Sequence, residues 1–290
     1  MRLVMLICPR RSVLFMPGSN KRAIEKAKTL NADSIVFDLE DAVAPEIKDI
    51  ARQQIIEAIH QGGYGDKELI IRVNHVNTPQ GQEDITAMAN SGADAICLPK
   101  VESVDELILA TKMMEDAGAP STMQLWAMIE TPKGVLQVNT IAQYKKLSVL
   151  AMGTSDLTKD LRARHTPERS ALITSLSLCI LAARANDVEI LDGVYLDLSD
   201  DEGFSNCCDQ GRDLGFGGKT LIHPKQLVDA NRAFGPSEAE IEHAEKVLSA
   251  WKLAEDESKA VAVVDDKLIE ILHVEEANRL LALAKTINKS

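Results

Sequence analysis

The feature that most constrains the fold of this 290-residue chain is a short apolar run that recurs eight times. Most of these runs are rich in Val, Ile and Leu and lack polar alternation, which is typical of parallel strands covered on both faces. Segments with helical periodicity separate the runs. Helix starts are predicted where a proline follows a polar residue, at 78–79, 131–132, 166–167 and 223–224. The runs span residues 13–16, 34–37, 69–73, 95–98, 125–129, 147–152, 190–196 and 219–222. The chain is therefore predicted to contain eight βα units.

Eight βα units within residues 1–235 favour a (β/α)8 barrel, or TIM barrel, as one catalytic domain. A doubly wound open sheet is the alternative, because periodicity does not show whether a sheet closes. The repeat ends at Gly235-Pro236, and residues 236–290 are predicted to form a small, mostly helical C-terminal extension or lid. Within it we expect helices over about 237–258 and 275–285, with a β-like stretch at 260–264.

Charge and cysteine content narrow the function classes. The chain has 32 Lys+Arg against 44 Asp+Glu, a net charge of −12, so it would repel nucleic acid and anionic membranes. Its five cysteines have no zinc-site spacing and indicate a reducing compartment. The apolar run 3–8 is too short for a signal peptide. We therefore expect a cytoplasmic protein that binds small molecules.

Polar residues follow nearly every apolar run, where the active site of a parallel barrel forms. Asp, Ser, Thr and Asn at such positions are equally well explained as N-caps of the next helix. Glutamate is a poor N-cap, so Glu130, which directly follows Met128-Ile129, is a stronger candidate for the barrel mouth. The other candidates at the ends of the runs include Asp38, Glu40, Asp41, Arg72, Asn74, Lys100, Glu102, Asp156, Asp197 and His223.

Carboxylates gathered at one rim would repel one another without a cation. Oxygen ligands with no nearby Cys/His set favour Mg²⁺, which binds one or two carboxylates and keeps waters for exchange. Arg72 is the natural counter-charge, and its planar donors suit a carboxylate or a developing enolate oxygen. A structural ion pair of Arg72 with Glu40 or Asp41 is the alternative.

Seven sequence blocks occur in order along the chain. They are RSxLFxPG at 11–18, DLEDxV at 38–43, RVN at 72–74, PKxE at 99–102, ETPxG at 130–134, GxxDL at 153–157 and GKxxIHPxQ at 218–226. Together these blocks resemble the citrate lyase β-subunit-like family. That family includes malyl-CoA, citramalyl-CoA and β-methylmalyl-CoA lyases and is distantly related to metal-dependent hydroxy-acid aldolases. Within it the chain is most similar to stand-alone (S)-citramalyl-CoA lyases of itaconate degradation.

The resemblance implies roles for the residues around the barrel mouth. Glu130 and Asp156 would ligate Mg²⁺, Asp41 would hold a metal-bound water and Glu40 would orient Arg72. Backbone N–H groups around Thr154–Asp156 would hold the carboxylate of a 2-oxo acid, and Gly153, Thr154 and Ser155 are the expected substrate-binding residues.

The resemblance also implies a coenzyme A site. Its expected residues are Arg11, Lys21, Arg22, Lys26 and His223. A solvated basic helix face explains residues 21, 22 and 26 about as well. The Arg-rich insertion 159–169 would either cover coenzyme A phosphates or line a subunit contact, and we favour the contact.

The family implies a Mg²⁺-dependent lyase that splits a short 3-hydroxyacyl-CoA, best (S)-citramalyl-CoA, into acetyl-CoA and pyruvate. A citrate lyase-type β subunit acting on acyl-carrier thioesters, a CoA-independent aldolase and a non-catalytic CoA-binding paralogue are the alternatives. Many stand-alone relatives carry an acid/base aspartate in the tail, where this chain has Glu270, which we expect to keep that role. The family also implies a homotrimer in which this tail reaches a neighbouring barrel.

Overall fold

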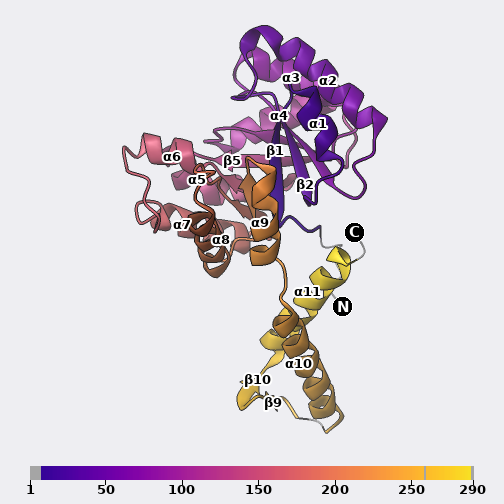
Figure 1. Ribbon diagram of the computed structural model, residues 1–290, viewed down its shortest axis with the longest axis vertical. Helices are drawn as coiled ribbons and strands as arrows, with labels where there is room; N and C mark the ends of the chain where they lie inside the picture. Colours follow the sequence, from indigo (N-terminus) through magenta and orange to yellow (C-terminus); the bar gives the residue numbers. More distant parts are fainter. Residues whose placement is uncertain (1–7, 258, 289–290) are drawn as a thin grey trace. The chain divides into compact units, whose positions relative to one another are not determined.

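The computed structural model describes residues 8–257 and 259–288, which form two compact units (Figure 1). One unit is Arg10–Phe234, and the other contains the chain from Gly235 onward. The N-terminal run 3–8, which we judged too short for a signal peptide, lies almost entirely outside the described residues. No helix among the described residues is both long enough and apolar enough to cross a membrane.

The first unit is a closed barrel of eight parallel strands in sequential order, which confirms the predicted (β/α)8 fold. Each strand pairs with the next, and β8 closes the ring by pairing with β1. The strands are β1 (Ser12–Pro17), β2 (Ser34–Asp38), β3 (Glu68–Arg72), β4 (Ala95–Leu98), β5 (Gln124–Ile129), β6 (Leu147–Met152), β7 (Glu189–Asp192) and β8 (Gly218–Leu221).

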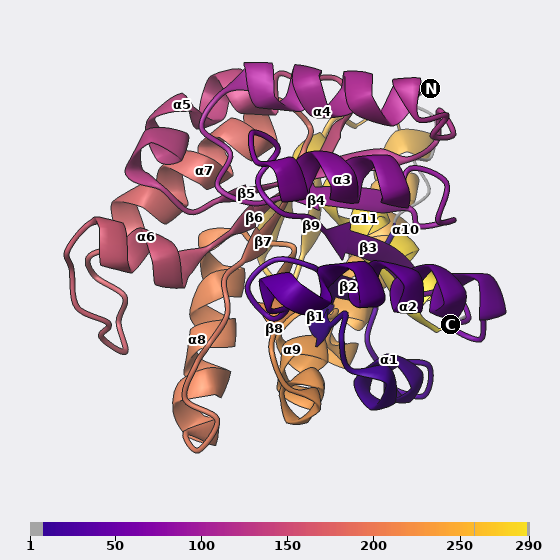
Figure 2. The ribbon, with the colours of Figure 1, turned by 90° about the horizontal axis from the view of Figure 1, so that it is seen from above.

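Helices surround these strands, as Figure 2 shows. Thr78 and Thr131 cap their helices by accepting the backbone N–H of the residue three positions on, as the Thr-Pro pairs predicted. Thr166-Pro167 begins no helix and lies in a loop instead. The helices are α1 (Lys21–Ala27), α2 (Lys48–Gln61), α3 (Pro79–Met88), α4 (Val104–Asp116), α5 (Pro132–Ala142), α6 (Thr154–Asp160), α7 (Ile173–Ala185), α8 (Asp201–Leu214) and α9 (Leu227–Phe234), with 3₁₀ turns η1 (Pro45–Ile47) and η2 (Pro224–Gln226).

The strands are apolar in continuous runs because both of their faces are buried. Alternate residues fill the barrel interior around Trp126, Ile70 and Val149. The intervening residues, such as Leu14, Ile35 and Ile96, pack against the helices in a separate and larger core. Side chains of a strand point alternately to opposite faces, so a strand buried on both sides has no polar position to reveal its period.

The seventh apolar run ends earlier as a strand than the sequence suggested. We expected it to extend to Leu196, with Asp197 at its carboxyl end, but β7 ends at Asp192. Asp192 is fully buried, and Lys219 on β8 compensates its charge by pairing with it at 2.7 Å. Residues 193–199 form the loop that follows, and Asp197 lies in that exposed loop.

The second unit consists of two long helices and a small hairpin. Helices α10 (Glu238–Asp256) and α11 (Ile271–Ile287) flank the antiparallel strands β9 (Ala262–Val264) and β10 (Lys267–Ile269). Its own small core includes Val247, Val264 and Ile269. The hairpin turns at Asp265 and Asp266, both at positive φ, so the β-like stretch is one half of a hairpin.

Candidate active site

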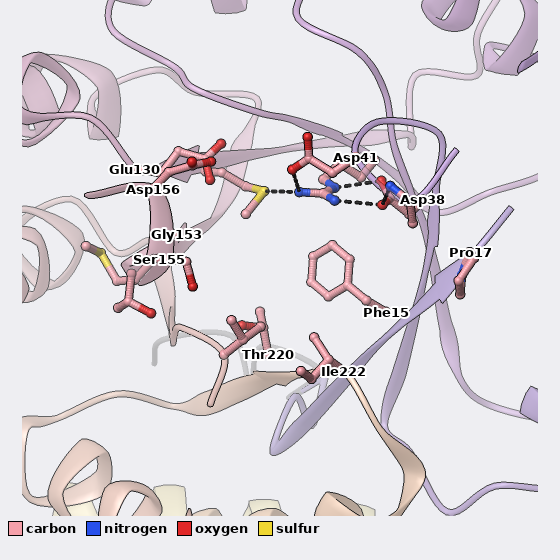
Figure 3. Close-up of a pocket in the computed structure, with 16 residues that line it drawn as sticks. Phe15, Pro17, Asp38, Asp41, Glu130, Gly153, Ser155, Asp156, Thr220 and Ile222 are labelled. Atoms are coloured by element: carbon pink, nitrogen blue, oxygen red, sulfur yellow. Dashed lines mark hydrogen bonds and ion pairs between the residues drawn. The ribbon is translucent and has the colours of Figure 1, made fainter. Parts of the chain in front are cut away.

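A cavity of about 400 Å³ opens at the carboxyl ends of the barrel strands (Figure 3). Glu130 and Asp156 lie together at one side of it, and Asp38 and Asp41 lie at another. Phe15, Met128, Val194 and Ile222 contribute apolar surface. The polar lining is Asp38, Asp41, Arg72, Glu130, Thr154, Ser155, Asp156 and Thr220. The structure thus brings most of the predicted catalytic and metal-binding residues to one cavity.

Arg72 is held by Asp38, a residue for which no specific role was predicted. Arg72 Nε lies 2.7 Å from Asp38 Oδ1, and Arg72 Nη2 lies 2.6 Å from Oδ2. Asp38 and Arg72 are register partners at the ends of β2 and β3, so the sheet itself brings them side by side. Asp38 also accepts the backbone N–H groups of Glu40 and Ala42. It therefore fixes the arginine and the acidic loop after β2 together.

The remaining nitrogen of Arg72 faces the other acidic residues. Arg72 Nη1 lies 2.8 Å from Glu40 Oε2 and 3.7 Å from Asp41 Oδ2. Burial raises the pKa of the Glu40 carboxyl, although the Arg72 charge opposes that shift. The predicted contact of Glu40 with Arg72 is present, but Asp38 provides the bidentate pair that orients the guanidinium.

Lys100 connects the two acidic sides of the cavity. Its backbone N–H donates to Glu130 Oε1 at 2.8 Å, while its ammonium lies 2.7 Å from Glu40 Oε1 and 3.4 Å from Asp156 Oδ2. Its φ of 52° is in the left-handed region, which costs free energy for a residue with a side chain. The strained residue Lys100 thus places its own positive charge among three carboxylates.

Glu130 follows β5 directly, as the sequence predicted, and is 2% exposed. Burial raises the pKa of its carboxyl to about 7, although the Lys100 charge opposes that shift. Gly153 makes room for it, because a Cβ atom there would lie 2.1 Å from Glu130 Oε2. This carboxylate is packed so closely that its ionised form needs a positive partner.

The residues fit a Mg²⁺ ion bound by two carboxylates. Glu130 and Asp156 flank the same space, and Asp156 stands in the first turn of α6 with its side chain 31% exposed. Within residues 8–257 and 259–288, no three His, Cys, Asp or Glu side chains form a complete metal cage. Such an ion would keep positions for water and substrate oxygens, as Mg²⁺ commonly does.

Gly153, Thr154 and Ser155 line the cavity between β6 and α6 as predicted. The N–H of Gly153 is already used, because it donates to the carbonyl of Ile129 at 3.1 Å. Any backbone donor for a substrate carboxylate must therefore come from the residues after Gly153.

The predicted coenzyme-binding residues do not gather at one place. Arg11 lies at the amino end of β1, the opposite end of the barrel from the cavity, and its guanidinium makes a bidentate pair with Asp33 at 2.7 and 2.8 Å. This placement argues against the coenzyme role expected for Arg11. Lys21, Arg22 and Lys26 are exposed on α1, which begins at the cavity end of β1.

His223 and Glu270 are both exposed. His223 follows β8 at the cavity end, and its Nδ1 accepts the backbone N–H of Lys225 at 3.2 Å. Glu270 belongs to the second unit and directly precedes α11, where its backbone N–H donates to His273 Nδ1 at 3.0 Å. The acid/base role of Glu270 stays a prediction.

The structure makes two candidate residues central for which no specific role was predicted. Asp38 is the last residue of β2 and Lys100 follows β4, so both stood among the candidates after apolar runs. The block 38–43 and the Pro-Lys pair at 99–100 were the signals. Only the register of β2 against β3, and the left-handed turn at Lys100, show what these residues contact.

Comparison with known proteins places the chain in a family. The family model described as HpcH/HpaI aldolase/citrate lyase matches residues 11–224. The (3S)-malyl-CoA thioesterase of Cereibacter sphaeroides is 47% identical over 279 residues, covering 96% of each chain. The citrate lyase subunit beta of Leuconostoc mesenteroides subsp. cremoris is 34% identical, covering 95% of this chain and 93% of its own.

A solved structure agrees with these relatives. The citrate lyase beta subunit of M. tuberculosis, complexed with oxaloacetate and magnesium, has a TM-score of 0.67 at 26% identity, covering 79% of this chain and 98% of its own. The closed barrel, the family model and the relatives agree with one another. The chain belongs to the HpcH/HpaI aldolase/citrate lyase family.

Proposed function

We propose that this protein is a Mg²⁺-dependent carbon–carbon lyase that cleaves a short 3-hydroxyacyl-CoA, with (S)-citramalyl-CoA as the leading substrate. The observation that carries this proposal is that the Glu130 and Asp156 carboxylates and the guanidinium of Arg72 line the same cavity. The first two would hold a cation beside the hydroxy-acid end of the substrate, and the third offers a donor to the thioester oxygen. The relatives named for citrate lyase and malyl-CoA support the substrate class.

In this reaction a base removes the proton of the 3-hydroxyl, and the bond between carbons 2 and 3 breaks. The electron pair moves into the thioester as an enolate, which takes up a proton to give acetyl-CoA, while the carbinol carbon becomes the ketone of pyruvate. Bound Mg²⁺ would supply Lewis-acid polarisation of the hydroxyl and carboxylate oxygens. Arg72 Nη1 would stabilise the enolate oxygen while Asp38 keeps the guanidinium plane fixed.

Hydrolysis of (3S)-malyl-CoA is a second candidate, which the 47% identical thioesterase supports. Water would add to the thioester carbonyl, the oxyanion would face Arg72, and the carbon–sulfur bond would break to release malate and the coenzyme thiol. The same cavity serves either reaction, since both develop negative charge on the thioester oxygen.

One assay separates the two reactions. The full chain is incubated with Mg²⁺ and either (S)-citramalyl-CoA or (3S)-malyl-CoA, and free thiol, acetyl-CoA and 2-oxo acid are quantified together. Carbon–carbon cleavage yields equal acetyl-CoA and oxo acid with no free thiol. Hydrolysis yields free thiol and hydroxy acid instead. If neither thioester is turned over, the carrier-dependent or non-catalytic alternative is supported. If free hydroxy acids are cleaved, the CoA-independent aldolase is supported.

The acid/base role proposed for Glu270 has its own test. Glutamate has the proton chemistry of the family aspartate with one more methylene, so we expect Glu270→Ala to lower kcat by about 10²-fold or more while Mg²⁺ and CoA still bind. Glu275→Ala, at an exposed position on α11, is the matched control and should turn over normally. Normal turnover by Glu270→Ala would place the base elsewhere.

We also propose a homotrimer, in which the second unit of one protomer reaches a neighbour's barrel. Light scattering of the full chain at micromolar concentration should give three times the 31.6 kDa monomer mass. A monomer at that concentration would contradict the proposal. Among the described residues, Cys97, Cys179, Cys207 and Cys208 form no disulfide, which supports a reducing, cytoplasmic location. A role in itaconate degradation is proposed from the resemblance of the sequence blocks to (S)-citramalyl-CoA lyases.

A further inference from the structure

A second cavity, of about 360 Å³, lies beside the first in the barrel unit. Thr154, Ser155 and Val194 line both cavities, so the two share a wall. The connection between α6 and α7, which projects from the barrel in Figure 2, forms the other side of the second cavity. This connection includes most of the Arg-rich insertion at residues 159–169. The proposed reaction assigns no role to that insertion.

The second cavity borders a buried charge cluster with more cations than anions. Lys219 and Asp192 are fully buried, and their charged atoms lie 2.7 Å apart. Arg169, whose side chain is 11% exposed, pairs through Nη1 with the same carboxylate at 2.7 and 2.8 Å. The ion pairs of both cations, among the described residues, run to this one carboxylate. Two positive charges therefore share one negative charge.

The unbalanced charge has a specific location. Arg169 Nε donates to Gln210 Oε1 at 2.7 Å, but Nη2 is buried and has no hydrogen-bond partner among the described residues. Arg169 lines the second cavity and adopts a φ of 50°, the left-handed region that is costly for a non-glycine residue. A buried donor without an acceptor is expensive, and more so when it is charged.

The other groups at this cavity do not supply the missing negative charge. Asp197 lines it but is exposed, and its Oδ1 already accepts the N–H and hydroxyl of Ser199. Cys207 Sγ accepts a hydrogen bond from Lys219 Nζ at 3.3 Å. The exposed Arg164 and His165 add donors at the rim.

We propose that the second cavity is an oxyanion site, in which a phosphate or carboxylate group bound at Arg169 supplies the negative charge that the buried Asp192–Lys219–Arg169 cluster lacks. This inference goes beyond the proposed reaction and does not depend on it. Two sources offer this chemistry: the phosphates of a coenzyme A thioester and a free carboxylate metabolite. Guanidinium binds both groups with the same paired donors.

The test uses the full chain without Mg²⁺ and inorganic phosphate as the probe, measured by calorimetry. We expect wild type to bind phosphate and Arg169→Met to bind it about 10- to 100-fold more weakly, the usual loss for a charge-assisted hydrogen bond. Arg169→Met leaves Lys219 and Asp192 as a balanced pair, so the fold should persist. If it does not, Arg169→Lys replaces it, because lysine keeps the charge but lacks the fork and should still weaken binding.

Two further variants make the result specific. Arg184→Met removes an exposed arginine that pairs with Glu189, and it should bind phosphate as wild type does. Glu130→Gln removes a ligand of the proposed metal site and should also bind phosphate as wild type does. The phosphate measurement therefore stays informative even if the proposed reaction is wrong. Competition then identifies the source: displacement by coenzyme A but not by pantetheine indicates its phosphates, and displacement by malate indicates a carboxylate.

Two results would overturn the proposal. One is the absence of phosphate binding by wild type. The other is equal phosphate affinity in wild type and the Arg169 variants, which would place the anion elsewhere on the protein.

Discussion

The barrel contains two charge clusters of opposite imbalance, one at each cavity. At the first cavity five carboxylates, Asp38, Glu40, Asp41, Glu130 and Asp156, surround the two cations Arg72 and Lys100. At the second cavity two cations, Lys219 and Arg169, share the carboxylate of Asp192. The first cluster lacks positive charge and the second lacks negative charge. Each imbalance indicates the sign of the ligand that would complete it.

The difference also predicts which substitutions each cluster tolerates. A variant that removes the minority charge leaves the others buried and uncompensated, while a variant that removes a majority charge moves the cluster toward balance. The two clusters should therefore respond in opposite ways to the loss of an anion. The predictions below test this contrast.

The largest effect should follow from removing the single anion of the second cluster. Asp192→Asn leaves Lys219 and Arg169 buried without a partner, so we expect a loss of about 3–5 kcal/mol in the free energy of unfolding. Burial opposes the ionisation of Asp192, but the two cations lower the pKa of its carboxyl, so the charged form is the native one. Urea unfolding measures the change. Lys219→Met is the matched variant, and because Arg169 still pairs with Asp192 it should cost clearly less; an equal loss would contradict the imbalance.

Removing the proposed metal ligand Glu130 should have the next largest effect, this time on activity. Glu130→Gln keeps the volume but not the charge, so turnover of the thioester should fall by about 10³-fold or more, because a polarising cation contributes several kcal/mol. EDTA should do the same to wild type, and added Mg²⁺ should restore only wild type. Activity that survives EDTA would remove the metal from the proposed function.

Arg72→Lys tests the paired donors of Arg72, a minority cation of the first cluster, without removing its charge. Lysine keeps the positive charge but loses the fork that Asp38 grips, so we expect kcat to fall by about 10²- to 10³-fold. Circular dichroism and thermal unfolding report whether the barrel is intact. A near wild-type kcat would show that Arg72 acts mainly as a structural partner of Asp38.

The smallest effect should come from removing a majority charge at the first cavity. Glu40→Gln without Mg²⁺ relieves repulsion among the carboxylates but loses the ion pairs with Arg72 and Lys100, so the free energy of unfolding should change by less than about 1 kcal/mol. Asp192→Asn provides the comparison under the same conditions. If Glu40→Gln destabilises the chain as much as Asp192→Asn does, the first cluster is not overloaded with negative charge.

The apolar runs predicted the barrel because each strand is buried on both faces, which leaves few other folds for eight of them. They could not show where β7 ends: residues 193–196 continue the apolar pattern, yet Asp192 already ends the strand beside Lys219. Similarly, Glu130 was predictable as a glutamate that caps no helix. The pairing of Asp38 with Arg72 was not, because it depends on strand register across more than thirty residues.

The prediction that Arg11 binds coenzyme A disagrees with its position in the structure, for a related reason. Its block matched the family, but a motif records which residues occur together and not which end of a strand they occupy. Arg11 precedes β1 and pairs with Asp33, which precedes β2, so both stand at the amino ends of their strands. The charge imbalance around Asp192 was equally invisible, because its members come from three separate segments of the chain.

The register pairing of Asp38 with Arg72 links the quality of folding to activity. The hydrogen-bond ladder that aligns β2 with β3 is also what sets the guanidinium opposite its carboxylate. A chain that refolds with these strands displaced by one residue would turn the arginine to the other face of the sheet. Such a molecule could keep most of its secondary structure yet lack a reacting centre. The specific activity of a refolded sample would thus report the fraction of molecules whose strands are correctly aligned. A spectrum of overall helix and strand content would not report that fraction.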